Sequence, residues 1–349
     1  FMALLSRRKA MLGTAAFAAL PVLGKPATAA SGRIRLSLDW KLQGQHAYFF
    51  VAQEKGYFRD EGLDVVIDQS EGSAATIPRV MSGAYEAGIG DINVIVEQAA
   101  KKPGEAPVMV YQVYNRPPFV IVVNKSSSIV KLKDLEGHTI GAPAGSGAAR
   151  LIPALAKRNG VDMSKINISN MQLSLQEQML VQGKIDGLST YNSTAYINLL
   201  LQGKDPDNDF RWFNFGDYGL DLYSNGIMVS PKFLQENPAA ITAMVRALNR
   251  AVKDTAADIG AANASLMKVE PLLNESAEKR RNDYCFRELF TSPETDARGF
   301  GDVDEERLAR GIALLVEAFE LPRTPAVAEI FNHSFLPPKP ERMIRYRAS

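Results

Sequence analysis

Apolar and polar positions along the first third of the chain alternate between two patterns. Short apolar runs, typical of buried strands, are separated by longer amphipathic stretches with helical spacing. The strands are expected at 34–40, 64–68, 87–91 and 108–115, and the helices at 46–58, 73–82 and 92–102. A strand–helix repeat of this kind predicts a mostly parallel sheet with right-handed crossovers.

A second region repeats this alternation after Arg116-Pro117-Pro118, where two prolines exclude a central strand. Its strands are expected at 119–124, 139–142, 166–171, 185–188 and 211–215, with helices at 149–159, at 175–182 and after 191–193. Residues 222–229 form an apolar segment that is expected to cross back. The pattern therefore predicts an α/β fold of two Rossmann-like lobes with mostly parallel sheets, joined by a two-crossing hinge.

The rest of the chain is mainly helical. Helices are expected at 238–259, 264–270, 282–290 and 304–319. Pro271 is expected to end the helix before it. A chain of 349 residues is long enough for two α/β lobes. We expect lobe 1 to comprise 31–116 and the return segment 222–340 with its C-terminal helices, lobe 2 to comprise 117–221, and a tail outside the fold at 341–349.

Residues 1–30 have the pattern of an export signal. Arg7-Arg8-Lys9 precedes a weakly apolar run at 10–23, and small residues before Ala30 suit cleavage near Ala29/Ala30. The arginine pair and Lys25 favour the twin-arginine route over the general one. A membrane anchor is the alternative, but the run is too short and too rich in small residues. The mature chain is expected to be soluble and periplasmic.

Charge and composition exclude several function classes. With 40 basic and 39 acidic residues, the formal net charge of +1 gives no long-range field for nucleic acid. The one cysteine, Cys285, excludes an intramolecular disulfide and is expected to be a small buried hydrophobe. Because the three histidines are far apart in sequence, no metal or other cofactor is expected. No Ser/His/Asp set or phosphate-binding loop motif is present, so no catalytic residue is assigned.

The first candidate binding residues lie where the first predicted strand ends. Ligand sites of open α/β sheets lie at such carboxyl ends and face helix N-termini. Trp40 can stack on a flat ligand, Asp39 can bond a ligand amine or amide, and His46 can donate or accept. Each has a structural alternative, namely a core tryptophan, a turn acceptor and a hydrogen bond inside the lobe. Gln43 belongs to the polar turn 41–44 between them.

Two predicted helix N-termini, one in each lobe, form a second candidate group. Gly72, Ser73 and Ala74 open one helix, with Ser73 expected as its N-cap. Ser146 and Gly147 open the other. Free backbone N–H groups and a small hydroxyl suit a carboxylate, sulfonate, phosphate or ligand carbonyl. Ordinary helix capping is the alternative.

Three more polar candidates follow predicted strands. Asp91 ends the strand at 87–91, and Tyr191 and Asn192 follow the strand at 185–188, so each can face a cleft between the lobes. The consecutive aromatic residues 48–50 are expected in the core instead, because a helix cannot turn all three toward one cleft.

Several short motifs, taken in order, resemble the type II periplasmic solute-binding proteins of ABC importers. They are Leu38-Asp39-Trp40 with His46, Lys55-Gly56-Tyr57-Phe58, Glu61-Gly62-Leu63, Lys133-Asp134-Leu135-Glu136-Gly137 and Gly183-Lys184-Ile185-Asp186-Gly187. More narrowly, the chain resembles the branch of alkanesulfonate, taurine and nitrate binders, thiamine-pyrimidine binders and hydroxymethylpyrimidine synthases. The resemblance implies the type II fold, a small-molecule ligand bound by hinge closure, membrane permease subunits as partners and a monomeric protein.

The chain departs from the synthases of this branch at their catalytic positions. The stretch that matches their catalytic Lys and His carries Gly90 and Val94 here, and residues 222–226 replace their cysteine-rich run. The turn 41–44 replaces the proline-containing turn of the pyrimidine binders. We therefore expect a binding protein and not an enzyme, with a flat nitrogen-bearing ligand such as a pyrimidine. An organic anion, a synthase-like enzyme and a ligand-presenting sensor remain the alternatives.

Overall fold

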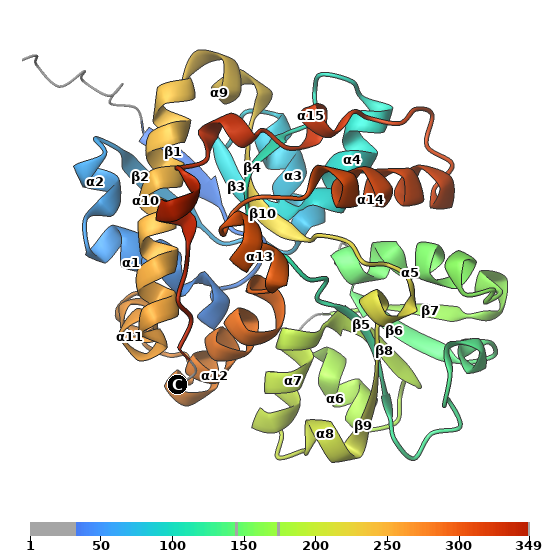
Figure 1. Cartoon of the computed structure of the whole chain (residues 1–349). Coiled ribbons are helices and arrows are strands. Elements are labelled where there is room, and N and C mark those ends of the chain that lie inside the picture. Colours follow the sequence, from blue (N-terminus) through green and yellow to red (C-terminus); the bar gives the residue numbers. More distant parts are fainter. Residues whose placement is uncertain (1–32, 144–145, 173–174, 348–349) are drawn as a thin grey trace, which may run out of the picture.

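The computed structural model describes residues 33–143, 146–172 and 175–347, so the export signal predicted at 1–30 lies outside the described residues. Figure 1 shows two lobes, each built on a sheet with helices packed around it. Each sheet has five strands. This is the predicted two-lobed α/β fold.

Lobe 1 contains the first sheet, whose strand order is β2-β1-β3-β10-β4. The strands are β1 (Arg33–Ser37), β2 (Asp64–Asp68), β3 (Ala87–Asp91), β4 (Val108–Gln112) and β10 (Asn225–Val229). The connecting helices are α1 (Ala47–Glu54), α2 (Tyr57–Asp60), α3 (Ser73–Met81) and α4 (Ile92–Lys101). Tyr48, Phe49 and Phe50 of α1 are all buried, as predicted, because α1 lies between the sheet and the C-terminal helices.

Lobe 2 contains the second sheet, whose strand order is β7-β6-β8-β5-β9. The strands are β5 (Phe119–Asn124), β6 (Thr139–Pro143), β7 (Asn167–Met171), β8 (Gly187–Tyr191) and β9 (Phe210–Asn214). The helices are α5 (Gly147–Arg158), α6 (Gln176–Val181), α7 (Asn192–Leu201) and α8 (Pro206–Asp209). The two lobes therefore repeat one layout, as the sequence pattern predicts.

Both sheets are mixed, with one strand in each running against the others. In lobe 1, β10 is antiparallel to β3 and β4, whereas β1 is parallel to β2 and β3. In lobe 2, β5 is antiparallel to β8 and β9, whereas β6 is parallel to β7 and β8. Each reversed strand is the first that the chain forms after crossing between lobes, at 113–118 or 215–224. The prediction of mostly parallel sheets holds for the remaining strands.

The C-terminal helices complete lobe 1. They are α9 (Pro231–Glu236), α10 (Pro238–Ala257), α11 (Ile259–Val269), α12 (Glu275–Cys285), α13 (Pro293–Arg298), α14 (Glu305–Ala318) and α15 (Val327–Ile330). The helix predicted at 282–290 is instead the end of α12 followed by a wider π-helical turn. Cys285 is buried, as predicted.

Residues 341–347, expected in a tail outside the fold, pack against lobe 1. The buried Arg342 side chain donates to the carbonyl oxygens of Pro337, Gly299 and Phe300. The Tyr346 ring stacks on Phe286 with centroids 5.9 Å apart. Among the described residues, no helix combines the length and apolar character needed to cross a membrane.

Candidate functional site

A cavity lies between the two lobes. Lobe 1 contributes the residues that follow β1, the start of α3 and the start of β10, and lobe 2 contributes the ends of β6 and β8 and the starts of α5, α6 and α7. The lining residues are Asp39, Trp40, Gln45, Gly72, Ser73, Pro143, Ser146, Gly147, Gln176, Thr190, Tyr191, Thr194 and Asn225. The cavity thus lies at strand ends and helix starts, where the fold was expected to bind a ligand.

The structure brings seven of the predicted residues together around this cavity. They are Asp39, Trp40, Gly72, Ser73, Ser146, Gly147 and Tyr191. Five others do not line it, and their surroundings explain why. Those five are Gln43, His46, Ala74, Asp91 and Asn192.

Asp39 lies in the bend after β1 and is almost completely buried. Its Oδ1 is 2.8 Å from His46 Nε2, and its Oδ2 accepts from Asn225 Nδ2. The backbone N–H of Gln43 donates to His46 Nδ1 at 3.3 Å, which leaves the proton on Nε2 facing Asp39. His46 is fully buried behind Asp39, so in this structure it positions the carboxylate and does not line the cavity.

Trp40 lies beyond the first strand and not inside it, because β1 ends at Ser37. Its half-buried ring lines the cavity and also a more open outer groove. Gln43 lines this outer groove, as do Gln176 and Thr194, which belong to both spaces. The indole therefore stands at the boundary between the enclosed cavity and the more open entrance.

The two helix N-termini differ in how they are capped. Ser146 caps α5, with its hydroxyl accepting from the Ala149 N–H at 3.0 Å. The prediction that Ser73 caps α3 is wrong. The N-cap is Gly72, whose φ of 110° favours glycine, and the Ser73 hydroxyl accepts from the Asp91 N–H at 3.1 Å. The capping geometry differs because Ser73 is already the first helical residue.

Asp91 is the N-cap of α4 and is only 1% exposed. Its Oδ1 accepts from the Asn93 backbone N–H at 3.1 Å and from Asn93 Nδ2 at 2.7 Å. Its Oδ2 is buried without a hydrogen-bond partner. Burial, opposed in part by the bonds from Asn93, raises the pKa of Asp91 to about 7.

Tyr191 links lobe 2 to the residues around Asp39. Its hydroxyl donates to Asn225 Oδ1 at 3.1 Å, and Asn225 in turn donates to Asp39. The ring lies edge-on to Tyr114 in the first crossing and to Phe119 at the start of β5. A hydrogen-bonded path therefore runs from His46 through Asp39 and Asn225 to Tyr191, across the interlobe boundary.

Two predicted residues face other surroundings. The Asn192 side chain accepts from the Ser193 N–H at 2.7 Å and borders a surface groove beside the first crossing. Ala74 lies on the first turn of α3 without reaching the cavity.

Sequence reasoning did not single out six of the lining residues. They are Gln45, Pro143, Gln176, Thr190, Thr194 and Asn225. Thr190 and Thr194 flank the candidates Tyr191 and Asn192, so the strand-end rule applied over a wider window finds them. Asn225 begins β10 immediately after the second crossing, where hinge segments meet the cleft. Gln176 carries no comparable local signal.

On the outer side of the cleft, α12 of lobe 1 lies beside α7 of lobe 2 (Figure 1). The guanidinium of the buried Arg281 donates to the Ser193 carbonyl at 3.0 Å and to Asn198 Oδ1 at 3.1 Å. Its Nε donates to Glu278 Oε2 at 2.9 Å, and Glu278 accepts from the Gly44 N–H at 2.6 Å. This buried ion pair thus joins both lobes.

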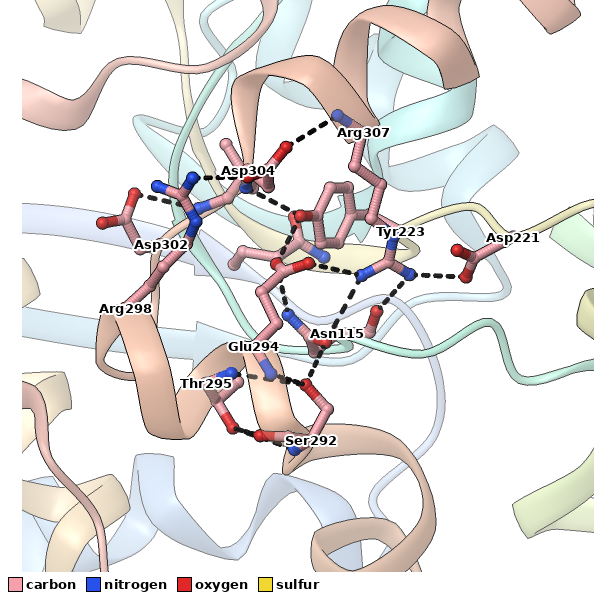
Figure 2. Close-up of polar contacts among 12 residues, drawn as sticks. Asn115, Asp221, Tyr223, Ser292, Glu294, Thr295, Arg298, Asp302, Asp304 and Arg307 are labelled. Atoms are coloured by element: carbon pink, nitrogen blue, oxygen red, sulfur yellow. Dashed lines mark hydrogen bonds and ion pairs between the residues drawn. The ribbon is translucent and has the colours of Figure 1, made fainter.

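The two crossings are held by a polar cluster around Arg307 of α14 (Figure 2). Its Nη2 donates to the Asn115 carbonyl of the first crossing and to Asp221 Oδ1 of the second, both at 2.8 Å. Its Nη1 donates to Glu294 of α13 at 3.1 Å, and its guanidinium lies 4.0 Å from the centre of the Tyr223 ring. The hinge segments are therefore fixed to the C-terminal helices of lobe 1.

The positions that resemble the catalytic Lys and His of the synthases hold no reactive group. Gly90 lies in β3, where an added Cβ would meet the Met228 side chain at 2.8 Å. Val94 is buried on α4. Within the described part of the chain, no group of His, Cys, Asp and Glu is arranged to hold a metal ion.

Comparison with known proteins identifies a family and several relatives of this chain. The family described as NMT1/THI5 like matches residues 43–261. A formylaminopyrimidine-binding protein from Halalkalibacterium halodurans is 26% identical over 61% of this chain, and the riboflavin-binding protein RibY from Chloroflexus aurantiacus is 26% identical over 65%. Each match spans 63% of the relative's own length. A hydroxymethylpyrimidine phosphate synthase from Saccharomyces cerevisiae is 22% identical over 74% of this chain and 78% of its own length.

The fold is shared with solved periplasmic binding proteins. The aliphatic sulphonate binding protein SsuA from Escherichia coli superposes with a TM-score of 0.67 over 91% of this chain and 96% of SsuA. The two sequences are 17% identical, so the likeness is one of fold.

Proposed function

The chain belongs to the NMT1/THI5-like family, and on this premise we propose that it is the extracytoplasmic solute-binding component of an ABC importer. The observation that carries the proposal is the interlobe cavity, which takes lining residues from both lobes, among them Asn225 directly after the second crossing. A ligand in this space contacts the closed arrangement more extensively than an open one. It therefore shifts the population toward closure, which importer membrane subunits would recognise.

For the ligand, we favour a flat nitrogen-bearing ring of the pyrimidine type. Trp40 offers an indole face at the cavity boundary, and Asp39 and Asn225 offer hydrogen-bonding groups at its inner end. Such a ring buries area against the indole while its amino groups bond the polar end. The names of two relatives, a formylaminopyrimidine binder and a riboflavin binder, agree with a nitrogen heterocycle.

A binding role fits the site better than the synthase role of the yeast relative. Gly90 and Val94 supply neither an amine for Schiff-base chemistry nor an acid–base group. Cys285 is buried, and burial raises the pKa of its thiol to about 12, so the reactive thiolate is disfavoured.

An organic anion such as a sulfonate is the second candidate. The N-termini of α3 and α5 meet at the cavity, and helix N-termini favour negative groups. The likeness to SsuA is one of fold alone and carries no information about the ligand of this chain.

A thermal-shift screen of the protein with pyrimidines, flavins, alkanesulfonates and aromatic carboxylates tests the proposal. A ligand that binds only the folded state raises the midpoint by mass action. We expect at least one nitrogen heterocycle to do so. Stabilisation by none of the compounds, with the protein well folded, would contradict a solute-binding role for this ligand range.

A further inference from the structure

We infer that Gln176 is a specificity-determining residue of the cavity, and that its amide oxygen accepts a hydrogen bond from an N–H or O–H group of the ligand. This inference rests on the proposed solute-binding function and identifies the group of lobe 2 that selects a ligand donor over an ether, an ester or another acceptor. It follows from a chain of hydrogen bonds that fixes the direction of the Gln176 amide.

Gln176 is the first residue of α6 and is only 2% exposed. It lines both the cavity and the outer groove, as Trp40 does. Its Nε2 donates to Glu177 Oε1 at 2.8 Å, whereas its Oε1 is buried and has no hydrogen-bond partner among the described residues. Because an unpaired buried amide oxygen is costly, a ligand donor that reaches it removes that cost.

The direction of the Gln176 amide is set by a group that can only donate. The guanidinium of Arg281 donates from Nη2 to Asn198 Oδ1 at 3.1 Å, so the amide nitrogen of Asn198 is the end that faces Glu177. Asn198 Nδ2 donates to Glu177 Oε1 at 3.2 Å, the same oxygen that accepts from Gln176. Glu177 therefore receives two amide nitrogens, and the oxygen of Gln176 is left free.

The free oxygen belongs to the cavity side of the amide. Glu177 is not among the described residues that line the cavity or the outer groove, so the nitrogen of Gln176 is turned toward the interior of lobe 2. The nitrogen and oxygen of a planar amide point in different directions from their shared carbon, which leaves the oxygen for the lining.

This chain of hydrogen bonds crosses the interlobe boundary. Arg281 lies on α12 of lobe 1, whereas Asn198, Glu177 and Gln176 belong to lobe 2. Arg281 reaches Asn198 because α12 lies beside α7. The Gln176 acceptor is thus held in its direction most firmly in the closed arrangement, which is the one that contacts the ligand from both sides.

Lobe 1 contributes a second amide of the same kind. Gln45 is 5% exposed and lines the cavity, and its Nε2 donates to Gln43 Oε1 at 2.9 Å. Its Oε1 is likewise buried and unpaired among the described residues. A ligand with donors on two edges is therefore better suited to this cavity than one with a single donor.

Isothermal titration calorimetry with one ring and two capped analogues tests the role of Gln176. The ring is 4-amino-5-hydroxymethyl-2-methylpyrimidine, and the analogues carry a methyl ether in place of the hydroxyl or a dimethylamino group in place of the amine. Titrations at pH 8 keep Glu177 ionised, since burial raises its pKa to about 7. We expect one of the two caps to weaken binding by about tenfold in the wild-type protein.

In Gln176→Met the penalty of that cap should disappear, because the acceptor is gone while a side chain of similar size remains. Gln178→Met replaces an exposed glutamine of the same helix and should keep the full penalty. Glu177→Met should lose the penalty although Gln176 is present, since nothing then directs its amide. Glu177→Gln, whose amide oxygen still accepts, should restore it.

If the ring binds and neither cap weakens binding to the wild-type protein, the inference is overturned and the solute-binding proposal stands. The same follows if Gln176→Met folds and retains the full penalty of both caps. A full penalty in Glu177→Met would overturn the hydrogen-bond chain from which the inference is drawn. Binding of none of the three compounds would instead contradict the pyrimidine-type ligand and the inference that rests on it.

Discussion

At the scale of single residues, the cavity is defined by the directions of a few side chains. Trp40 was expected in a strand end and is found just beyond it, with its ring between the cavity and the outer groove. His46 was expected to meet the ligand directly and instead lies behind Asp39. Both residues follow one strand, and of the two only Trp40 lines the cavity.

Replacing Trp40 by Ala is expected to weaken binding of a pyrimidine probe by about tenfold or more, because the stacking face is lost. The free energy of unfolding should change little in comparison, since the ring is only half buried. Calorimetry and chemical denaturation measure the two effects. Unchanged affinity would rule out stacking on Trp40.

The pKa of Asp91 predicts a pH-dependent stability in the ligand-free protein. Burial raises this pKa from 3.8 to about 7, so between these values the folded state holds a proton that the unfolded state has lost. The contribution of Asp91 to folding therefore becomes less favourable as pH rises from about 4 to 7. Removing the titrating group in Asp91→Asn should make the melting temperature fall less steeply over this range.

The other charged groups near Asp91 are the same in the wild-type protein and in Asp91→Asn. Arg150 and Glu97 act on its pKa in opposite directions, and Tyr191 lies opposite it. Glu177, whose pKa burial also raises to about 7, contributes a similar slope in both proteins. Parallel melting curves for wild type and Asp91→Asn from pH 5 to 8 would therefore show that Asp91 does not titrate as described.

Gly147 is expected to be required for close approach of the lobes. In Gly147→Ala the new Cβ would lie 2.8 Å from Asp91 Oδ2 and Tyr191 Oη, which is closer than such atoms approach. Pyrimidine affinity should fall, because the closed arrangement is the one that contacts the ligand from both sides. In Gly260→Ala on α11, the nearest atom lies 3.4 Å away, so this control should bind normally.

At the scale of elements, two helices from different lobes are joined on the outer side of the cleft. Arg281 and Glu278 of α12 connect to α7 and to the turn before α1. Nothing local in the predicted helices indicates this contact, because α12 and α7 are far apart in the sequence. A buried ion pair of this kind is costly to break on one side only.

Replacing Arg281 by Met alone should lower the free energy of unfolding by about 3–5 kcal/mol, because Glu278 is left buried without its partner. The double variant Glu278→Gln/Arg281→Met should recover part of this stability. It should still bind a pyrimidine probe more weakly than wild type, since the bonds from α12 to α7 are lost. Wild-type affinity in a stable double variant would show that this contact does not support closure.

At the scale of the whole molecule, two crossings and the cluster around Arg307 determine how the lobes can move. Arg307 bonds both crossings from one helix (Figure 2). Rotation of lobe 2 must therefore occur beyond the residues that this cluster holds, within short segments next to β5 and β9.

Arg307→Met is expected to loosen this hinge, because Asp221 and Glu294 lose their shared cation. We expect a lower melting temperature and a larger radius of gyration in small-angle scattering of the ligand-free protein. Arg310→Ala removes an exposed charge from the same helix and should change neither. Identical scattering and melting for Arg307→Met and wild type would contradict a bracing role.

The sequence by itself determined the number of lobes, the alternation of strands and helices and the types of chemical groups present. These depend on local apolar periodicity and on residue identity, which act over short stretches of chain. It also placed Asp39, Trp40, Ser73, Ser146, Gly147 and Tyr191 at strand ends and helix starts, all of which line the cavity.

Only the tertiary structure decided which of these groups contact one another and how burial changes their pKa values. Asn225 joins Asp39 to Tyr191 although the three are far apart in sequence, and His46 serves Asp39 because both are enclosed together. Asp91, predicted as one more cleft residue, is instead a buried carboxyl group that caps α4 and lies against the start of α5. Burial among segments that are distant in sequence raises the pKa of Asp91 and leaves its Oδ2 without a hydrogen-bond partner among the described residues. Neither property is encoded in a short stretch of chain.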